Sequence, residues 1–316
     1  MKMTSTILTY SSMTERILVT GGTGQVGREL KTILPNAVFV GSRDYDLTSC
    51  EAVSQMYKDI QPTTVIHSAA KVGGILDNIQ HQVEYYSENV MMNTLVVDNA
   101  LKYGVKNFIG ILSTCVYPDV VDVYPMKETS LHDGKPTLTN FSYGIAKRGM
   151  AVHIDAIREK YKYNYCYLIP CNLYGPHDKF DYRSHYVGAL VKKIHDAVKN
   201  NETEIVLYGD GSPLRQFLYA EDLARIIALM IEQKIYQNLN IATESNISID
   251  EIARIALQVL QCDNMTIRYD TSKPNGQYRK DVCISELRKH FPDFSFTSLE
   301  YGINKVYSHY STLHKD

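Results

Sequence analysis

The feature that most constrains the fold is a glycine-rich segment, TGGTGQVG (residues 20–27), which follows a short apolar run and precedes a helical pattern. Strand, tight turn and helix in this order are typical of a site for the phosphates of a dinucleotide. Glycine lets a phosphate approach the backbone, and the N-terminus of a helix favours anions. A tight turn without a ligand is the alternative. The dinucleotide interpretation predicts a cofactor site made by Gly21, Thr23, Gly24, Gln25, Val26 and Gly27.

Short apolar runs alternate with helical segments through the first half of the chain, at residues 17–20, 38–42, 63–70, 107–113 and 163–170. This alternation predicts an α/β fold with a doubly wound parallel (Rossmann) sheet. Beyond Asn172 the pattern loosens, which predicts a smaller C-terminal lobe that binds the substrate. We expect a flexible leader (1–13), a dinucleotide-binding domain (14–172) and a substrate-binding lobe (173–316), of which about 214–245 returns to the first domain.

Composition narrows the class of partner. The 33 Lys and Arg residues nearly balance the 35 Asp and Glu residues, and no basic stripe stands out, so we expect neither nucleic acid nor a membrane surface as a partner. The start of the chain lacks the apolar core of a signal peptide, and no segment approaches a membrane span. Six scattered cysteines without a CxxC pair predict a reducing, cytoplasmic location and no metal site.

The residues after the second strand should select the cofactor. An acidic side chain there binds the 2′-hydroxyl of NAD, whereas a cation favours the 2′-phosphate of NADP. The segment GSRDYDL supplies both types, in Arg43 and Asp44. We interpret Arg43 as the phosphate ligand, which predicts NADP(H).

The segment LSTCVYP (residues 112–118) ends a predicted strand and carries Ser113 and Cys115 two residues apart. Side chains at this spacing in a strand point to the same face. Further on, SYGIAKRGM places Tyr143 and Lys147 one helical turn apart, where a lysine cation would lower the pKa of the phenol toward a working range. Ser113 would then polarise a carbonyl that Tyr143 protonates. Glycine-rich turn, strand-end serine and YxxxK together resemble the extended short-chain dehydrogenase/reductase superfamily.

Cys115 and His185 are not needed for a plain reduction. Taken alone, each has an ordinary structural explanation, because a lone cysteine is more often a small buried apolar residue. A ketone held between a thiolate and an imidazole on opposite faces would lose a proton on one side and regain it on the other, which is epimerisation through an enolate. The residues themselves leave both interpretations open.

A wider set of segments resembles one family. STCVYP, SYGIAKR, NLYGPHDKF with SHYVGALVKK, LYGDGSPLRQFLYAEDLA and KPNGQYRKD are similar to successive motifs of the GDP-L-fucose synthase family, from about Arg16 to near the C-terminus. This resemblance implies a 3,5-epimerase and NADPH-dependent 4-reductase of GDP-4-keto-6-deoxy-D-mannose. It implies that Cys115 is the base and His185 the acid of the epimerisation. For the reduction, it implies that Tyr143 is the proton donor, supported by Lys147, which also holds the cofactor ribose, and by Ser113.

The same resemblance implies further ligands. Lys193, Arg215 and Lys280 would bind the diphosphate of the GDP-sugar, and Ala69 and Asn172 would line the nicotinamide and sugar site. Two positions depart from the family pattern: Thr23 stands where some relatives carry an arginine, and Tyr208, a predicted substrate contact, where a tryptophan is often found.

Apolar faces on the segments around residues 88–104 and 146–161 exceed what one sheet buries, and the resemblance implies a homodimer with a four-helix interface. The alternative is a helix pair packed wholly within one chain. Two other functions stay open: a reductase or epimerase-reductase of a related GDP-keto-sugar, such as a heptose, and a nucleotide-sensing protein that has lost catalysis.

Overall fold

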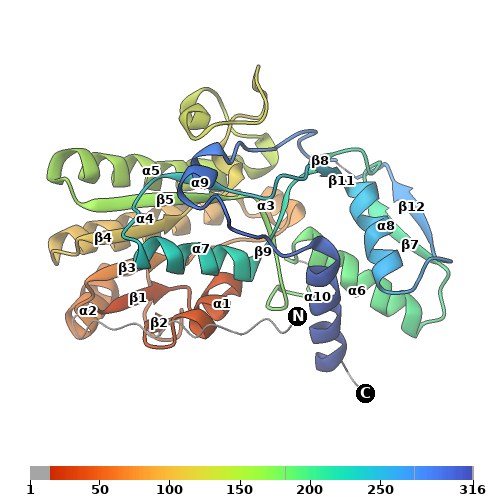
Figure 1. The fold of residues 1–316 in the computed structure, drawn as a ribbon, viewed down its shortest axis with the longest axis horizontal. Coiled ribbons are helices and arrows are strands. Elements are labelled where there is room, and N and C mark those ends of the chain that lie inside the picture. The colour runs from red at the N-terminus through yellow and green to blue at the C-terminus, as the bar shows by residue number, and fades with distance from the viewer. Residues whose placement is uncertain (1–14, 182, 274, 315–316) are drawn as a thin grey trace.

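A computed structural model describes residues 15–181, 183–273 and 275–314. The expected leader, residues 1–13, lies outside the described residues. A six-stranded parallel sheet forms the centre of the larger part of the molecule (Figure 1), which confirms the predicted doubly wound α/β class. In spatial order its strands are β10 (Leu239–Ile241), β5 (Asn164–Pro170), β4 (Asn107–Ile111), β3 (Thr64–His67), β1 (Ile17–Thr20) and β2 (Val38–Val40).

The sheet is flanked by helices that pack on one another in two groups. One group comprises α2 (Cys50–Ile60), α4 (Gln82–Lys102) and α5 (Phe141–Tyr161), and the other comprises α1 (Gln25–Ile33) and α7 (Ala220–Glu232). Shorter helices α3 (Ile75–Gln80) and α9 (Ser285–His290) lie near α4 and β10, respectively. β1 and β3 are buried along their whole length, and β5 is buried from its second residue on, as expected for a parallel sheet covered on both faces.

A second, smaller group of elements lies to one side of the sheet (Figure 1). It contains α6 (Tyr186–Lys199), α8 (Ile249–Val259), α10 (Leu299–Leu313) and the parallel pair of β7 (Glu204–Tyr208) and β12 (Thr266–Asp270). Two further short pairs, β6 (Asn172–Tyr174) with β9 (Phe217–Tyr219) and β8 (Leu214–Arg215) with β11 (Ile247–Ser248), complete the set of strands.

Two separate buried clusters correspond to these two parts. The larger contains the six central strands together with α7 and residues 282–294, and the smaller joins α6, α8 and α10. The buried residues of 223–242 thus pack with the first cluster, although they follow β6 in the chain. We keep the division into a dinucleotide-binding domain and a substrate-binding lobe as a proposal.

The arrangement of the strands explains where a site can form. Parallel strands bring their carboxyl ends to one edge of the sheet, and ligands bind there where successive strands diverge. β1 pairs with β2 on one side and with β3 on the other, so the strand order reverses at β1. The glycine-rich turn, Arg43, Ala69 and Ser113 each follow the carboxyl end of one of these strands or of β4.

Candidate active site

The glycine-rich turn has the backbone that a phosphate site needs. Gly21 has a φ of +75°, and a Cβ built there would lie 2.7 Å from the backbone nitrogen of Ala69. A Cβ on Gly27 would lie 2.6 Å from the Cα of Gly22, so α1 can approach the turn only with glycine at this position. Gly24 is the N-cap of α1 and provides no side-chain cap, which leaves N–H groups at the helix N-terminus available for an anion.

Other residues around the turn are placed to complete a dinucleotide site. Thr23 and Gly24 are exposed, and the buried Nε2 atom of Gln25 has no hydrogen-bond partner among the described residues. Arg43 is exposed after β2, while the carboxylate of Asp44 accepts a hydrogen bond from the backbone nitrogen of Gly41 at 2.7 Å. Of these two, only Arg43 has a side chain without a hydrogen bond or ion pair to the described residues. The chain therefore fits a dinucleotide with a cation near the 2′ position of the ribose.

The predicted strand geometry of Ser113 and Cys115 is wrong. β4 ends at Ile111, and Thr114–Val116 form a turn of 3₁₀ helix whose N-cap is Ser113. The Ser113 hydroxyl accepts a hydrogen bond from the backbone nitrogen of Cys115 at 3.3 Å. The polar sequence favours this capped turn, because a serine at the N-cap satisfies an N–H that has no partner within the helix. The turn still brings both side chains to the carboxyl end of β4.

Tyr143 and Lys147 lie on the buried side of α5, and Lys147 is only 1% exposed. The Nζ atom of Lys147 donates a hydrogen bond to the carbonyl oxygen of Ile111 at 2.7 Å. Burial lowers the pKa of Lys147 to about 7. Burial also raises the pKa of the Tyr143 phenol, and a negative charge on Cys115 raises it further. The expected lowering of the Tyr143 pKa by Lys147 is thus not found, because desolvation dominates at this buried position.

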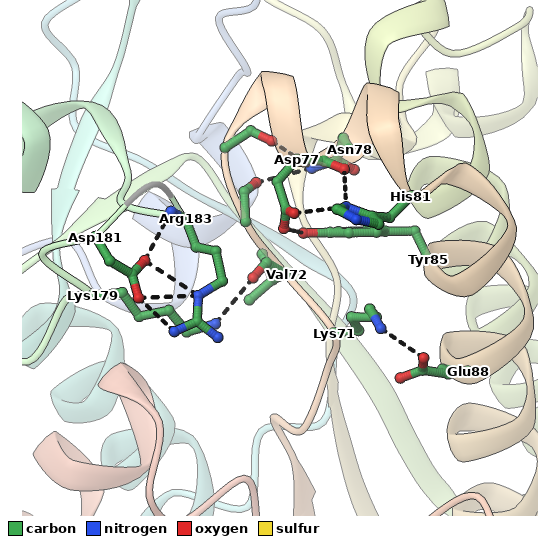
Figure 2. Close-up of polar contacts among 12 residues, drawn as sticks. Lys71, Val72, Asp77, Asn78, His81, Tyr85, Glu88, Lys179, Asp181 and Arg183 are labelled. Carbon is green, nitrogen blue, oxygen red and sulfur yellow. Dashed lines mark hydrogen bonds and ion pairs between the residues drawn. The ribbon is translucent and has the colours of Figure 1, made fainter.

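Tyr143 is held by residues that sequence analysis did not identify. The ring of Tyr85, from α4, packs edge to face on Tyr143, with ring centroids 6.3 Å apart. The Tyr85 hydroxyl donates to Oδ2 of Asp77 at 2.5 Å, and Nδ1 of His81 lies 2.8 Å from Oδ1 of Asp77 (Figure 2). This arrangement fixes α3 against α4 beside the proposed proton donor. The spacing of Tyr85 and Asp77 in the sequence does not predict their contact, because it depends on how α3 and α4 pack together.

Cys115 is surrounded by hydrogen-bond donors. The Nζ atom of Lys280 lies 3.1 Å from the Cys115 Sγ atom, and Nδ2 of Asn140 lies 3.0 Å from it. Burial by itself would raise the pKa of the thiol, but the charge of Lys280 and hydrogen bonds from Ser113, Asn140 and Lys280 bring it below its usual value. Asn140, at the start of α5, was not predicted from the sequence.

His185 lies at the N-terminus of α6 and forms a pair with Asp178. Its Nδ1 atom is 3.0 Å from Oδ1 of Asp178, and its backbone nitrogen donates to Oδ2 at 3.2 Å. Burial by itself would lower the pKa of His185, yet the hydrogen bond and charge of Asp178 raise it overall. Asp178 lies within the motif NLYGPHDKF, but a single aspartate in a loop gave no signal for this role.

Nearby, Nζ of Lys179 donates to the carbonyl oxygen of Val72 at 3.2 Å and joins the two loops shown in Figure 2.

The remaining predicted ligands lie on α6, β7, β8 and β6. The Nζ atom of Lys193 donates to the carbonyl oxygen of Val206 at 2.7 Å and lies 5.0 Å from the ring centroid of Tyr208, which is 51% exposed. Arg215 lies on β8, where burial lowers its pKa to about 10 and the charge of Cys115 acts in the opposite direction. Asn172 donates to the carbonyl oxygen of Gln216 at 2.8 Å.

Ser113, Cys115 and the Nζ atom of Lys147 thus lie at the carboxyl end of β4, and the glycine-rich turn follows the carboxyl end of β1 in the same sheet. In the described part of the chain, no three or more His, Cys, Asp or Glu side chains are grouped to hold a metal ion. Over the same residues, no helix is both long and apolar enough to cross a membrane. The six cysteines are all free thiols.

Comparison with known proteins identifies the family. Residues 17–242 match the NAD dependent epimerase/dehydratase family. A GDP-L-fucose synthase from Dictyostelium discoideum is 35% identical over 309 residues, 94% of this chain and 96% of the relative. A GDP-L-colitose synthase from Yersinia pseudotuberculosis is 33% identical over 92% of this chain and 96% of the relative.

A solved structure extends the comparison to three dimensions. The crystal structure of a GDP-L-fucose synthetase from Naegleria fowleri bound to NADP superimposes with a TM-score of 0.87 at 32% identity, over 95% of this chain and 94% of that chain. The sequence relatives and the solved structure match nearly the whole length of the chain, and the family model matches residues 17–242. The chain is therefore a member of the NAD dependent epimerase/dehydratase family, in which it groups with the GDP-L-fucose synthases.

Proposed function

We propose that this protein is a GDP-L-fucose synthase, which inverts carbons 3 and 5 of GDP-4-keto-6-deoxy-D-mannose and then reduces carbon 4. The observation that carries the proposal is the pairing of two sets of groups at one edge of the sheet. Ser113, Tyr143 and Lys147 suit a reduction, and Cys115 with His185 suits proton exchange at carbon. A reductase alone needs only the first set.

For the epimerisation, the Cys115 thiolate removes a proton from the carbon next to the ketone, and His185 returns a proton to the opposite face of the same carbon. The enolate formed between these steps carries its negative charge on the ketone oxygen. The hydroxyl of Ser113 would donate a hydrogen bond to that oxygen and stabilise it. Inversion at the second carbon repeats the same exchange.

For the reduction, NADPH supplies the hydride when it is bound. Tyr143 gives its proton to the oxygen of carbon 4 as that oxygen becomes an alkoxide. Burial keeps the Tyr143 phenol protonated, so it is ready to act as an acid. Lys147 would hold the cofactor ribose and support Tyr143. The negative charge of a bound dinucleotide favours the cationic form of Lys147.

We also propose ligands for the cofactor and the substrate. Arg43 would bind the 2′-phosphate, and the glycine-rich turn would bind the pyrophosphate. Lys193 and Arg215, beside Tyr208 and on β8, would bind the diphosphate of the GDP-sugar. Lys280 would be the third cation at this diphosphate, and its Nζ atom also lies 3.1 Å from the Cys115 Sγ atom. Ala69 and Asn172 would line the nicotinamide and sugar site.

We also propose a cytoplasmic homodimer in which α4 and α5 pair with the same helices of a second copy. The outer surface of α4 exposes Val83, Tyr86 and Met91, and that of α5 exposes Val152. Between these helices lies a groove of about 300 Å³, lined by Val90, Asn93, Thr94, Ala146, Gly149, Met150, Val152, His153 and Ala156. An apolar surface of this kind is more typical of a protein–protein interface than of a surface exposed to solvent.

The experiment that tests the function is turnover of GDP-4-keto-6-deoxy-D-mannose in deuterated water, followed by NMR and by NADPH oxidation. We expect GDP-L-fucose labelled at carbons 3 and 5. Cys115→Ser should lose the label, while Cys283→Ser, a second partly exposed cysteine, should retain it. NADPH oxidation without label would support a reductase of a related GDP-keto-sugar. Binding of NADPH without any turnover would support a nucleotide-sensing protein.

A further inference from the structure

The thiol of Cys115, the proposed base, lies next to a buried cation. Lys280 is only 8% exposed, and its Nζ atom lies 3.1 Å from the Cys115 Sγ atom. An ammonium group has donors and no acceptor, so it can only donate to the sulfur, and its positive charge favours the thiolate over the thiol. Asn140 adds a second donor at 3.0 Å. A simple packing contact would not require a buried charge at this position.

His185, the proposed acid, is paired with a buried anion. The Asp178 side chain is 2% exposed, and its two oxygens accept from Nδ1 and from the backbone nitrogen of His185. A carboxylate in this geometry fixes the ring orientation and favours the imidazolium. Gly188 leaves the space for it, because a Cβ there would lie 2.5 Å from Oδ2 of Asp178.

We propose that Lys280 and Asp178 are positioning residues that ionise the acid/base pair before the substrate arrives: Lys280 holds Cys115 as a thiolate, and Asp178 holds His185 as an imidazolium. This inference rests on the proposed function, in which Cys115 is the base and His185 the acid. It gives Lys280 a role in epimerisation rather than only in diphosphate binding.

The pKa shifts of both groups agree with this assignment. The pKa of Cys115 is lowered despite burial, and that of His185 is raised despite burial. The charged groups that act on Cys115 are led by Lys280, and a charge on Cys115 in turn acts on Arg215, Tyr143 and His185. Those that act on His185 are Asp178, Lys179 and Cys115.

The two fixed charges also explain how one pair can invert two carbons. After the first inversion the thiolate has gained a proton and the imidazolium has lost one, so both groups are neutral. A net transfer of one proton from sulfur to imidazole restores the starting state. Lys280 favours loss of the proton from sulfur, and Asp178 favours its gain by imidazole. Lys280 lies 165 residues from Cys115 in the chain, so packing of the segment around Lys280 against the 3₁₀ turn after β4 sets the ionisation.

The role of Lys280 is tested without substrate or NADPH. The rate of alkylation of Cys115 by iodoacetamide is measured against pH, with the modified peptide identified by mass spectrometry. We expect the alkylation midpoint of Lys280→Met to lie at higher pH than that of the wild type, and Lys280→Arg to restore most of the shift. Lys280→Gln is the second neutral variant if the methionine variant does not fold. An unchanged midpoint in a folded neutral variant overturns the role of Lys280.

The role of Asp178 is tested by NMR titration of His185, assigned with His185→Gln. We expect a lower midpoint in Asp178→Asn. Asp181→Asn is the matched control, because Asp181 lies three residues away and pairs with Arg183. Equal midpoints in Asp178→Asn and the wild type overturn the role of Asp178.

Deuterium exchange into the keto sugar connects both roles to the reaction. Activity should rise with pH as Cys115 ionises and fall as His185 loses its proton. Lys280→Met should therefore move the acid limb to higher pH, and Asp178→Asn should move the alkaline limb to lower pH, with exchange at the optimum falling about 10- to 100-fold. Shifted midpoints in a protein that exchanges no deuterium would reject the proposed function but keep the ionisation. Normal exchange profiles in both variants would reject the inference and keep the function.

Discussion

The Nζ atom of Lys147 lies 2.7 Å from the carbonyl oxygen of Ile111, the last residue of β4. This contact joins the centre of α5 to the strand that leads into Ser113 and Cys115. A buried amine therefore lies at the end of β4, just before Ser113 and Cys115, which we assign to carbonyl binding and proton removal. The ionisation of this amine can therefore be followed through stability as well as through catalysis.

Replacement of Lys147 by Met should change the pH dependence of stability. In the folded protein burial lowers the pKa of Lys147 from 10.5 to about 7, so between these values the unfolded chain binds a proton that the folded chain does not. Stability therefore rises with pH through this window in the wild type. Urea unfolding at pH 7 and pH 9 should show the wild type gaining about 2 kcal/mol relative to Lys147→Met. An equal difference at both pH values would contradict the buried amine.

Arg43→Ala should reduce the preference for NADPH. Loss of one charged contact to the 2′-phosphate should raise the KM for NADPH about 10- to 100-fold and leave that for NADH nearly unchanged. Steady-state kinetics with each cofactor measures this. Lys31→Ala, an exposed cation in the last turn of α1, is the control and should change neither value. Equal increases for both cofactors would show that Arg43 does not read the 2′ position.

Gly144→Ala should disturb Cys115, the proposed base, rather than the cofactor site. A Cβ on Gly144 would overlap the carbonyl oxygen of Cys115 and lie 3.1 Å from Cβ of Pro136. Backbone must therefore move, at a cost of about 1–3 kcal/mol in the free energy of unfolding. Deuterium exchange at the sugar should fall, while the dissociation constant of NADPH, measured by fluorescence, should change little. Normal exchange in this variant would mean that the 3₁₀ turn adapts freely.

Val152→Asp should dissociate the proposed dimer. Val152 is 54% exposed on α5 and lines the groove between α4 and α5, so a carboxylate there would be buried without a partner in a four-helix interface. Light scattering should give the monomer mass for this variant and the dimer mass for the wild type. Val198→Asp places the same change on α6, at a valine that is 46% exposed, and should keep the dimer. A monomeric wild type would reject the interface.

The sequence by itself predicted the doubly wound α/β class and the first five strands of its sheet, but not the sixth strand, β10. The glycine-rich turn and the alternation of apolar runs with helical patterns are local signals, because the period of a strand or helix is set by neighbouring residues. Ser113, Tyr143 and Lys147 are predicted as site residues in the same way, by their positions relative to a strand end and a helical turn. Local spacing was misleading at residues 113–115, where a capped 3₁₀ turn replaces the end of the predicted strand.

Tertiary structure decided the partners and the ionisation of these groups. Asn140 and Lys280 meet Cys115 only because segments 25 and 165 residues away pack against it. Asp178 pairs with His185 through a loop that no periodic pattern describes. The pKa of Tyr143 is raised because the phenol is buried, although Lys147, one helical turn further along α5, suggests the opposite from the sequence. Desolvation and long-range charge depend on the whole packed fold, whereas a sequence pattern records only residue identity and spacing.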